Sequence, residues 1–143
     1  MHRMVGLGLM AALALLVVAV VPVAAAVRTP AHMEVQTNFD PADDPFTSNI
    51  AGCASGTVAT GDNTTQFVRM HGVFAGDKFF DCGDGSGFVV RLNAIFGYDG
   101  GSVGTWSIVG SWGSIAGLQG SGKLVGTSTG PDSIVDVYDG TMN

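Results

Sequence analysis

The chain has 143 residues, enough for one domain of ordinary size, and it carries a net charge of −6 at pH 7. Its six Lys and Arg residues are scattered along the sequence, whereas nucleic acids and anionic membrane surfaces are bound by clusters of basic side chains. The composition therefore argues against a nucleic-acid-binding protein and against a protein held to a membrane by basic residues.

Residues 1–26 have the features of a signal peptide. Met1 to Arg3 provide a short positive start, residues 4–21 are apolar and uncharged, and Ala24 to Ala26 supply the small residues that a signal peptidase needs. We expect cleavage after Ala26 and secretion, with no membrane contact afterwards. The alternative is an uncleaved anchor, because the uncharged stretch 4–27 is long enough to cross a bilayer.

Residues 27–52 are expected to form an extended segment and linker. They contain Pro30, Pro41, Pro45 and an acidic run at residues 40–44, which are features typical of loops. Only residues 33–39 in this stretch read as a strand, which would be the first strand of the domain.

Residues 53–143 are rich in glycine and patterned as β-structure. Of the 22 glycines in the chain, 20 lie between residues 52 and 140, and glycine at that density destabilises helix interiors. The sequence therefore predicts an all-β domain, an antiparallel barrel of about eight strands. Residues 114–119 are expected to form one helical turn at a crossover between strands. The apolar or alternating runs that predict the strands are residues 55–60, 65–74, 78–82, 87–96, 103–109, 122–127 and 134–138.

One strand shows which of its faces is buried. Along residues 87–96 every even position is apolar, which predicts that this face packs in a hydrophobic core. The residues expected on that core face are Phe88, Val90, Leu92, Ala94 and Phe96. The opposite faces of this run and of residues 65–74 carry polar side chains, which meet either water or a lined cavity. That polar set is Arg69, His71, Arg91 and Asn93.

Cys53 and Cys82 are the only two cysteines. In an exported protein a lone pair of cysteines is expected to form a disulfide. Closing a loop of this size would stabilise the fold by about 3 kcal/mol through its effect on the unfolded chain. The role of the pair would be structural.

Motifs for cofactors and nucleophiles are incomplete. Residues 117–124 resemble a phosphate-binding loop, but Leu124 stands where that loop needs Ser or Thr. Two G-x-S-x-G runs, at residues 100–104 and 126–130, lie in connections between predicted strands instead of in a strand-turn-helix. We expect no cofactor and no catalytic serine.

Three acidic residues, Asp77, Asp81 and Asp84, lie close to glycines. Carboxylate and carbonyl oxygens at such a turn would suit a calcium ion, but the EF-hand spacing and its closing Glu are absent. An acidic hairpin turn is the favoured interpretation, so we expect no metal site, and calcium is the alternative.

Four short motifs suggest a family. They are DCGDGSGF at residues 81–88, GTWSIVG at 104–110, GLQGSGKL at 117–124 and DVYDG at 136–140. This pattern resembles small exported bacterial proteins of unknown function, and it is similar to allene oxide cyclase-like and dirigent-like eight-stranded barrels. The resemblance covers residues 53–143.

The resemblance implies a barrel whose apolar interior holds a small hydrophobic molecule, and it implies barrels that pair by their outer faces as homo-oligomers. It does not imply cyclase activity. Residues 111–115 read SWGSI where relatives tend to have Gly-Thr-Gly-x-Tyr, so no role for a tyrosine is carried over.

Three functions are therefore compared. The leading interpretation is a secreted, non-enzymatic protein that binds a small apolar ligand. The alternative is a cyclase-like or coupling enzyme that templates a reaction in the barrel, with His71, Arg69 and Arg91 as candidate polar residues. A third is a surface structural or interaction protein. An interior lined by these three residues would favour the enzyme, whereas an apolar interior with these charges outside would favour a binder or a packed core.

Overall fold

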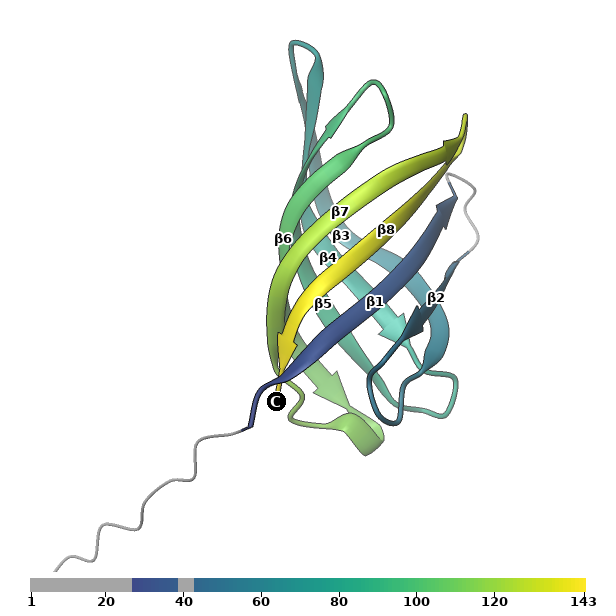
Figure 1. Cartoon of the computed structure of the whole chain (residues 1–143), viewed down its shortest axis with the longest axis vertical. Helices are drawn as coiled ribbons and strands as arrows, with labels where there is room; N and C mark the ends of the chain where they lie inside the picture. The colour runs from purple at the N-terminus through teal and green to yellow at the C-terminus, as the bar shows by residue number, and fades with distance from the viewer. Residues whose placement is uncertain (1–26, 39–42) are drawn as a thin grey trace, which may run out of the picture.

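The computed structural model describes residues 27–38 and 43–143, which form a closed antiparallel barrel of eight strands (Figure 1). The predicted fold class is therefore confirmed. The expected signal peptide, the alternative anchor and residues 39–42 lie outside the described residues. The strands are β1 (Thr29–Asn38), β2 (Asp44–Ser48), β3 (Ser55–Val68), β4 (His71–Asp81), β5 (Gly87–Gly97), β6 (Ser102–Trp112), β7 (Gly120–Gly130) and β8 (Ser133–Met142), and a single 3-10 turn, η1 (Gly113–Ile115), follows β6.

The first strand closes the barrel. β1 pairs with β8 over its whole length, from Thr29 opposite Met142 to Asn38 opposite Ser133. β1 also pairs with β2, and β2 pairs with β3. The barrel thus begins at Thr29 instead of at residue 53, which corrects the expectation that most of residues 27–52 form a linker.

The prolines of this segment occupy positions that a strand tolerates. Pro30 and Pro45 are each the second residue of their strand, and both are exposed on the outer face. β2 pairs with β1 from Phe46 onward, so Pro45 lies beyond that ladder. The inward side chains of β1 and β2 are buried, and this burial outweighs the low strand propensity of proline.

A second difference concerns residues 65–74, which the apolar pattern predicts as one strand. The chain reverses there, between the end of β3 at Val68 and the start of β4 at His71. The turn consists of Arg69 and Met70, and Arg69 adopts a positive φ of 57°. Neither residue is typical of tight turns, so the sequence does not predict this hairpin.

The two ends of the barrel differ. We call the end with the β2–β3, β4–β5 and β6–β7 connections the disulfide end, and the other the open end (Figure 1). Four inward aromatic side chains pack together in the disulfide half: Phe46, Phe80, Phe88 and Tyr138, the aromatic cluster. Phe80 stacks on Phe88 with ring centroids 4.6 Å apart, and it meets the edges of Phe46 and Tyr138 at 5.0 and 5.9 Å.

The predicted disulfide between Cys53 and Cys82 is present, with Cα atoms 5.1 Å apart. It joins the loop after β2 to the loop after β4. The hydroxyls of Ser86 and Ser114 lie 2.8 Å apart and connect that second loop to η1. A disulfide is consistent with an oxidising compartment.

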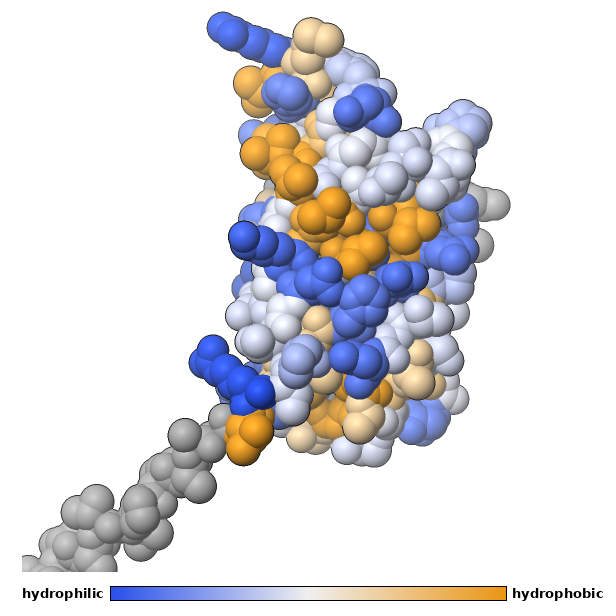
Figure 2. All heavy atoms as spheres, viewed as in Figure 1, coloured by the Kyte–Doolittle hydropathy of each residue, from blue (hydrophilic) through white to orange (hydrophobic). Residues whose placement is uncertain are grey.

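The outer wall carries an apolar belt. It runs across neighbouring strands through successive cross-strand pairs, and Figure 2 shows apolar side chains gathered on the viewed face. Within the described residues, no helix has the length and apolar character needed to cross a bilayer. The members of the apolar belt are Val73, Ile95, Val103, Val125 and Val137.

Candidate functional site

The open half of the barrel contains a cavity of about 750 Å³. The reason lies in the inward positions of its strands. In the disulfide half these positions carry large aromatic side chains, whereas in the open half many carry glycine, alanine, serine or threonine, which leave the space unfilled. The apolar part of the wall includes Phe74, Leu92, Ala94, Phe96, Leu124 and Ile134.

A lysine projects into this cavity. Lys78 lies on β4 two residues from the inward Phe80, and it lines the cavity. Its Nζ donates a hydrogen bond to Thr60 Oγ1 at 2.7 Å and lies 5.7 Å from the centre of the Phe74 ring. Burial lowers the pKa of Lys78, and the charges of Asp44 and Asp136 partly oppose that change.

Asp136, on β8, faces the same cavity. Its carboxylate accepts hydrogen bonds from Ser102 Oγ on β6 at 3.1 Å and from Thr37 Oγ1 on β1 at 3.2 Å. Burial raises the pKa of Asp136, and these two hydrogen bonds partly oppose the change.

The contact between Ser102 and Asp136 requires a glycine between them. β7 separates the two strands, and Gly126 is paired with both residues. A methyl group on Gly126 would overlap Ser102 Oγ and Asp136 Oδ1. The glycine therefore allows a polar contact to form across an intervening strand.

Asp44, the first residue of β2, is 7% exposed and accepts a hydrogen bond from the Asn38 N–H at 2.7 Å. The cavity, which Asp43 also lines, thus combines three carboxyl groups and one amine with apolar walls. Among the residues that the structure describes, the ion pairs within 4.0 Å involve His32 and Arg91 but not Lys78. The Lys78 amine is therefore near carboxyl groups without being held by one.

The three polar candidates from the sequence do not line this cavity. Arg91 lies on the outer face of β5, where Nε and Nη2 donate to the Asp77 carboxylate at 2.9 and 3.0 Å. This pair lowers the pKa of Asp77. Arg69 is in the β3–β4 turn and His71 begins β4, and both are exposed.

The interior instead holds the apolar residues of β5 that alternation predicts, Phe88, Val90, Leu92 and Ala94, all buried. The inward lysine and aspartates are the residues that sequence reasoning missed. The inward direction of Lys78 could have been predicted, because Lys78 lies an even number of residues from Phe74 and Phe80 on β4, and alternate residues of a strand share a face.

Asp81 and Asp84 cap the β4–β5 turn. Their carboxylates accept the backbone N–H groups of Gly83 and Ser86, each at 2.8 Å. These bonds are those of an acidic hairpin turn. Over residues 27–38 and 43–143, no group of three or more His, Cys, Asp or Glu side chains is placed to hold a metal ion.

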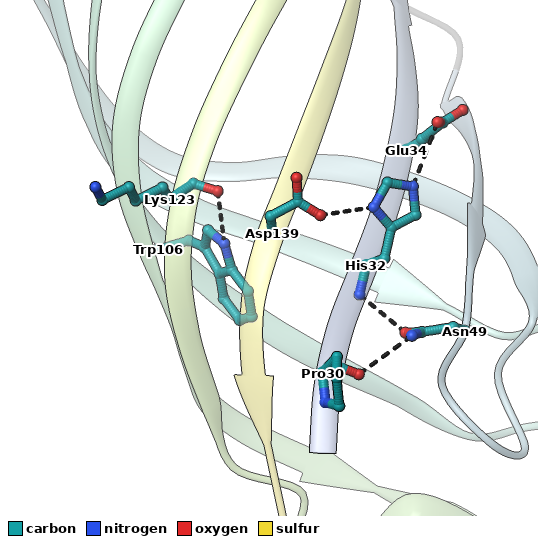
Figure 3. Close-up of polar contacts among 7 residues, drawn as sticks. All are labelled: Pro30, His32, Glu34, Asn49, Trp106, Lys123 and Asp139. Atoms are coloured by element: carbon teal, nitrogen blue, oxygen red, sulfur yellow. Dashed lines mark hydrogen bonds and ion pairs between the residues drawn. The ribbon is translucent and has the colours of Figure 1, made fainter. Parts of the chain in front are cut away.

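A histidine and two carboxylates meet on the outer wall (Figure 3). His32 Nδ1 lies 2.6 Å from Asp139 Oδ1, and its Nε2 lies 3.3 Å from Glu34 Oε1. The hydrogen bond to Asp139 is the main cause that raises the pKa of His32. The contact with Asp139 joins β1 to β8 at the seam that closes the barrel, and both side-chain partners of the imidazole are carboxylates. We assign His32 a structural role.

Comparison with known proteins finds no family model, curated protein or solved structure that matches the chain. The resemblance to allene oxide cyclase-like barrels therefore stays a prediction. The candidate site rests on the geometry of this chain alone.

Proposed function

We propose that this domain is a secreted, non-enzymatic protein that binds one small, mostly apolar molecule inside the barrel. The observation that carries the proposal is the cavity of about 750 Å³ in the open half. Ligand sites in proteins typically have volumes of about 300 to 1,000 Å³, apolar walls and a few polar groups. The cavity has all three features.

The closed floor of the cavity favours capture of a whole small molecule over passage through the barrel. The aromatic cluster fills the disulfide half, so a ligand enters and leaves at the open end. A ligand that buries about 300 Å² of apolar surface there would gain about 7 kcal/mol from the hydrophobic effect, before the cost of association.

The cyclase-like or coupling enzyme has less support. Its candidate residues, Arg69, His71 and Arg91, lie on the outside of the barrel or in a turn, away from the cavity. The third interpretation, a surface interaction protein that acts through homo-oligomers, is supported by the apolar belt, because exposed apolar patches often mark contact surfaces. Secretion is supported by the disulfide, since disulfides persist in oxidising compartments.

The proposal is tested by titrating the protein with N-phenyl-1-naphthylamine, a neutral probe that fluoresces in apolar surroundings. Ala94→Trp places an indole inside the cavity, because Ala94 is 6% exposed and lines its wall. We expect probe binding to weaken by about 100-fold, equivalent to about 2.7 kcal/mol.

The matched control is Ile95→Trp on the same strand. Ile95 is 51% exposed and belongs to the apolar belt, so its indole lies outside the barrel and binding should stay at the wild-type level. Ala94→Leu, a smaller change, should weaken binding less and guards against misfolding of the Trp variant. Loss of binding in Ile95→Trp but not in the Ala94 variants would place the probe on the belt and contradict the proposal.

A further inference from the structure

We propose that the cavity captures a hydrophobic aldehyde or ketone covalently, as an imine on Lys78 Nζ. This inference rests on the proposed function, because it names the ligand class for the same cavity. It follows from the position of one amine among apolar walls and carboxyl groups.

The position of the amine is the first step of the argument. Lys78 lies on β4, and Asp136 lies on β8, which is four strands away in either direction around the closed eight-stranded barrel. The two side chains therefore face each other across the lumen, and both line the cavity. A ligand in the cavity has its polar end between an amine and a carboxyl group.

The Lys78 amine is also free to react with a ligand. The structure gives Lys78 Nζ one hydrogen bond, to Thr60 Oγ1, and a lysine amine reacts through its nitrogen lone pair once it has lost a proton. Burial lowers the pKa of Lys78, which increases the neutral fraction at a given pH. Lys123, in contrast, is exposed on β7.

The charged groups of the cavity wall determine which polar group a bound ligand can carry. A ligand carboxylate or phosphate would be repelled by Asp44 and Asp136, and a ligand ammonium offers the Lys78 amine no electrophilic atom. A carbonyl group is neutral, accepts a hydrogen bond from the amine and presents an electrophilic carbon to it. The protonated imine that it forms keeps one positive charge beside the same two carboxyl groups.

Imine formation on Lys78 requires neither an oxidant nor a reductant. The neutral Nζ attacks the carbonyl carbon, and the carbonyl oxygen takes a proton to give a carbinolamine. Nζ loses a proton, the hydroxyl gains one, and it leaves as water while the C=N bond forms. Asp44 and Asp136 are the carboxyl groups on the cavity wall whose charges act on Lys78, and they can exchange these protons directly or through water. Burial raises the pKa of Asp136, and Ser102 and Thr37 hold its carboxyl group in place.

The test exposes the full secreted chain to decanal with sodium cyanoborohydride, which reduces an imine to a stable amine. Intact and peptide mass spectrometry then locate the adduct. We expect the fast lysine adduct on Lys78, forming about tenfold faster than on Lys123, because the cavity holds the aldehyde beside the Lys78 amine and burial lowers the pKa of Lys78. Lys78→Arg, which keeps the charge, should abolish the fast adduct, and Lys123→Arg should leave it unchanged.

Two results would overturn the inference, and they have different meanings. If decanol displaces N-phenyl-1-naphthylamine but decanal labels Lys78 and Lys123 at equal rates, the cavity binds ligands without covalent capture and only this inference fails. If the probe does not bind the wild-type protein and Lys78 is not labelled, the proposed function fails as well.

Discussion

Replacing Phe80 with alanine is expected to lower the free energy of unfolding by about 3 to 5 kcal/mol. Phe80 has no exposed surface, and its ring packs against Phe46, Phe88 and Tyr138. These residues come from β2, β5 and β8, so the truncation leaves a void among side chains of four strands. Urea unfolding followed by circular dichroism measures the effect.

The neighbouring residue provides the control. Phe79→Ala removes the same ring from the outer face, where Phe79 is 43% exposed, and it should cost no more than about 1 kcal/mol. Because a shift of register by one residue exchanges the two faces of a strand, equal losses for Phe79→Ala and Phe80→Ala would mean that the register of β4 is wrong.

Replacing both cysteines with alanine is expected to lower the free energy of unfolding by about 3 kcal/mol. The bridge closes a loop with a sequence separation of 29 residues, which contains the whole of β3 and β4. Without it, the unfolded chain gains conformational freedom, and the ends of these strands lose a covalent link. Thermal unfolding of Cys53→Ala/Cys82→Ala beside the wild-type protein measures the difference.

Reduction of the wild-type protein separates the contribution of the disulfide bond to stability from the contribution of the packing of its sulfur atoms. Cys53 is buried in the core, so the alanine variant loses contacts as well as the bond. The reduced wild-type protein should account for most of the loss. Probe binding by the folded fraction should be unaffected, because the cavity lies in the other half of the barrel. A wild-type unfolding temperature that does not change on reduction would contradict this prediction.

The fold was predictable where local signals agree with the tertiary structure. Residues 87–96 alternate strictly, and β5 buries the apolar face that this alternation indicates. Local sequence signals did not predict the elements whose structure is determined by tertiary packing. β2 contains Pro45 and is only five residues long, yet the barrel cannot close without it. The β3–β4 turn at Arg69 and Met70 lacks the residues that mark turns.

The candidate site was harder to predict because its charged residues lie in strands that are apolar on both faces. Asp136 stands between Val135 and Val137, and Lys78 precedes Phe79 and Phe80. Period-two alternation therefore does not show which way Asp136 points, whereas Lys78 shares the parity of Phe74 and Phe80 along β4 and could have been placed inside the barrel. Only the closed barrel, which places β4 opposite β8, brings the two groups into one cavity.

The most direct test of the ligand cavity is the mass of the protein recovered from the medium of cells that secrete it, incubated with a lipid extract of that medium. The mass is measured once in the folded state and once after denaturation in acid. We predict that the folded mass exceeds the denatured mass by that of a single small molecule. Equal folded and denatured masses after exposure to the extract would contradict a barrel that binds a small apolar ligand.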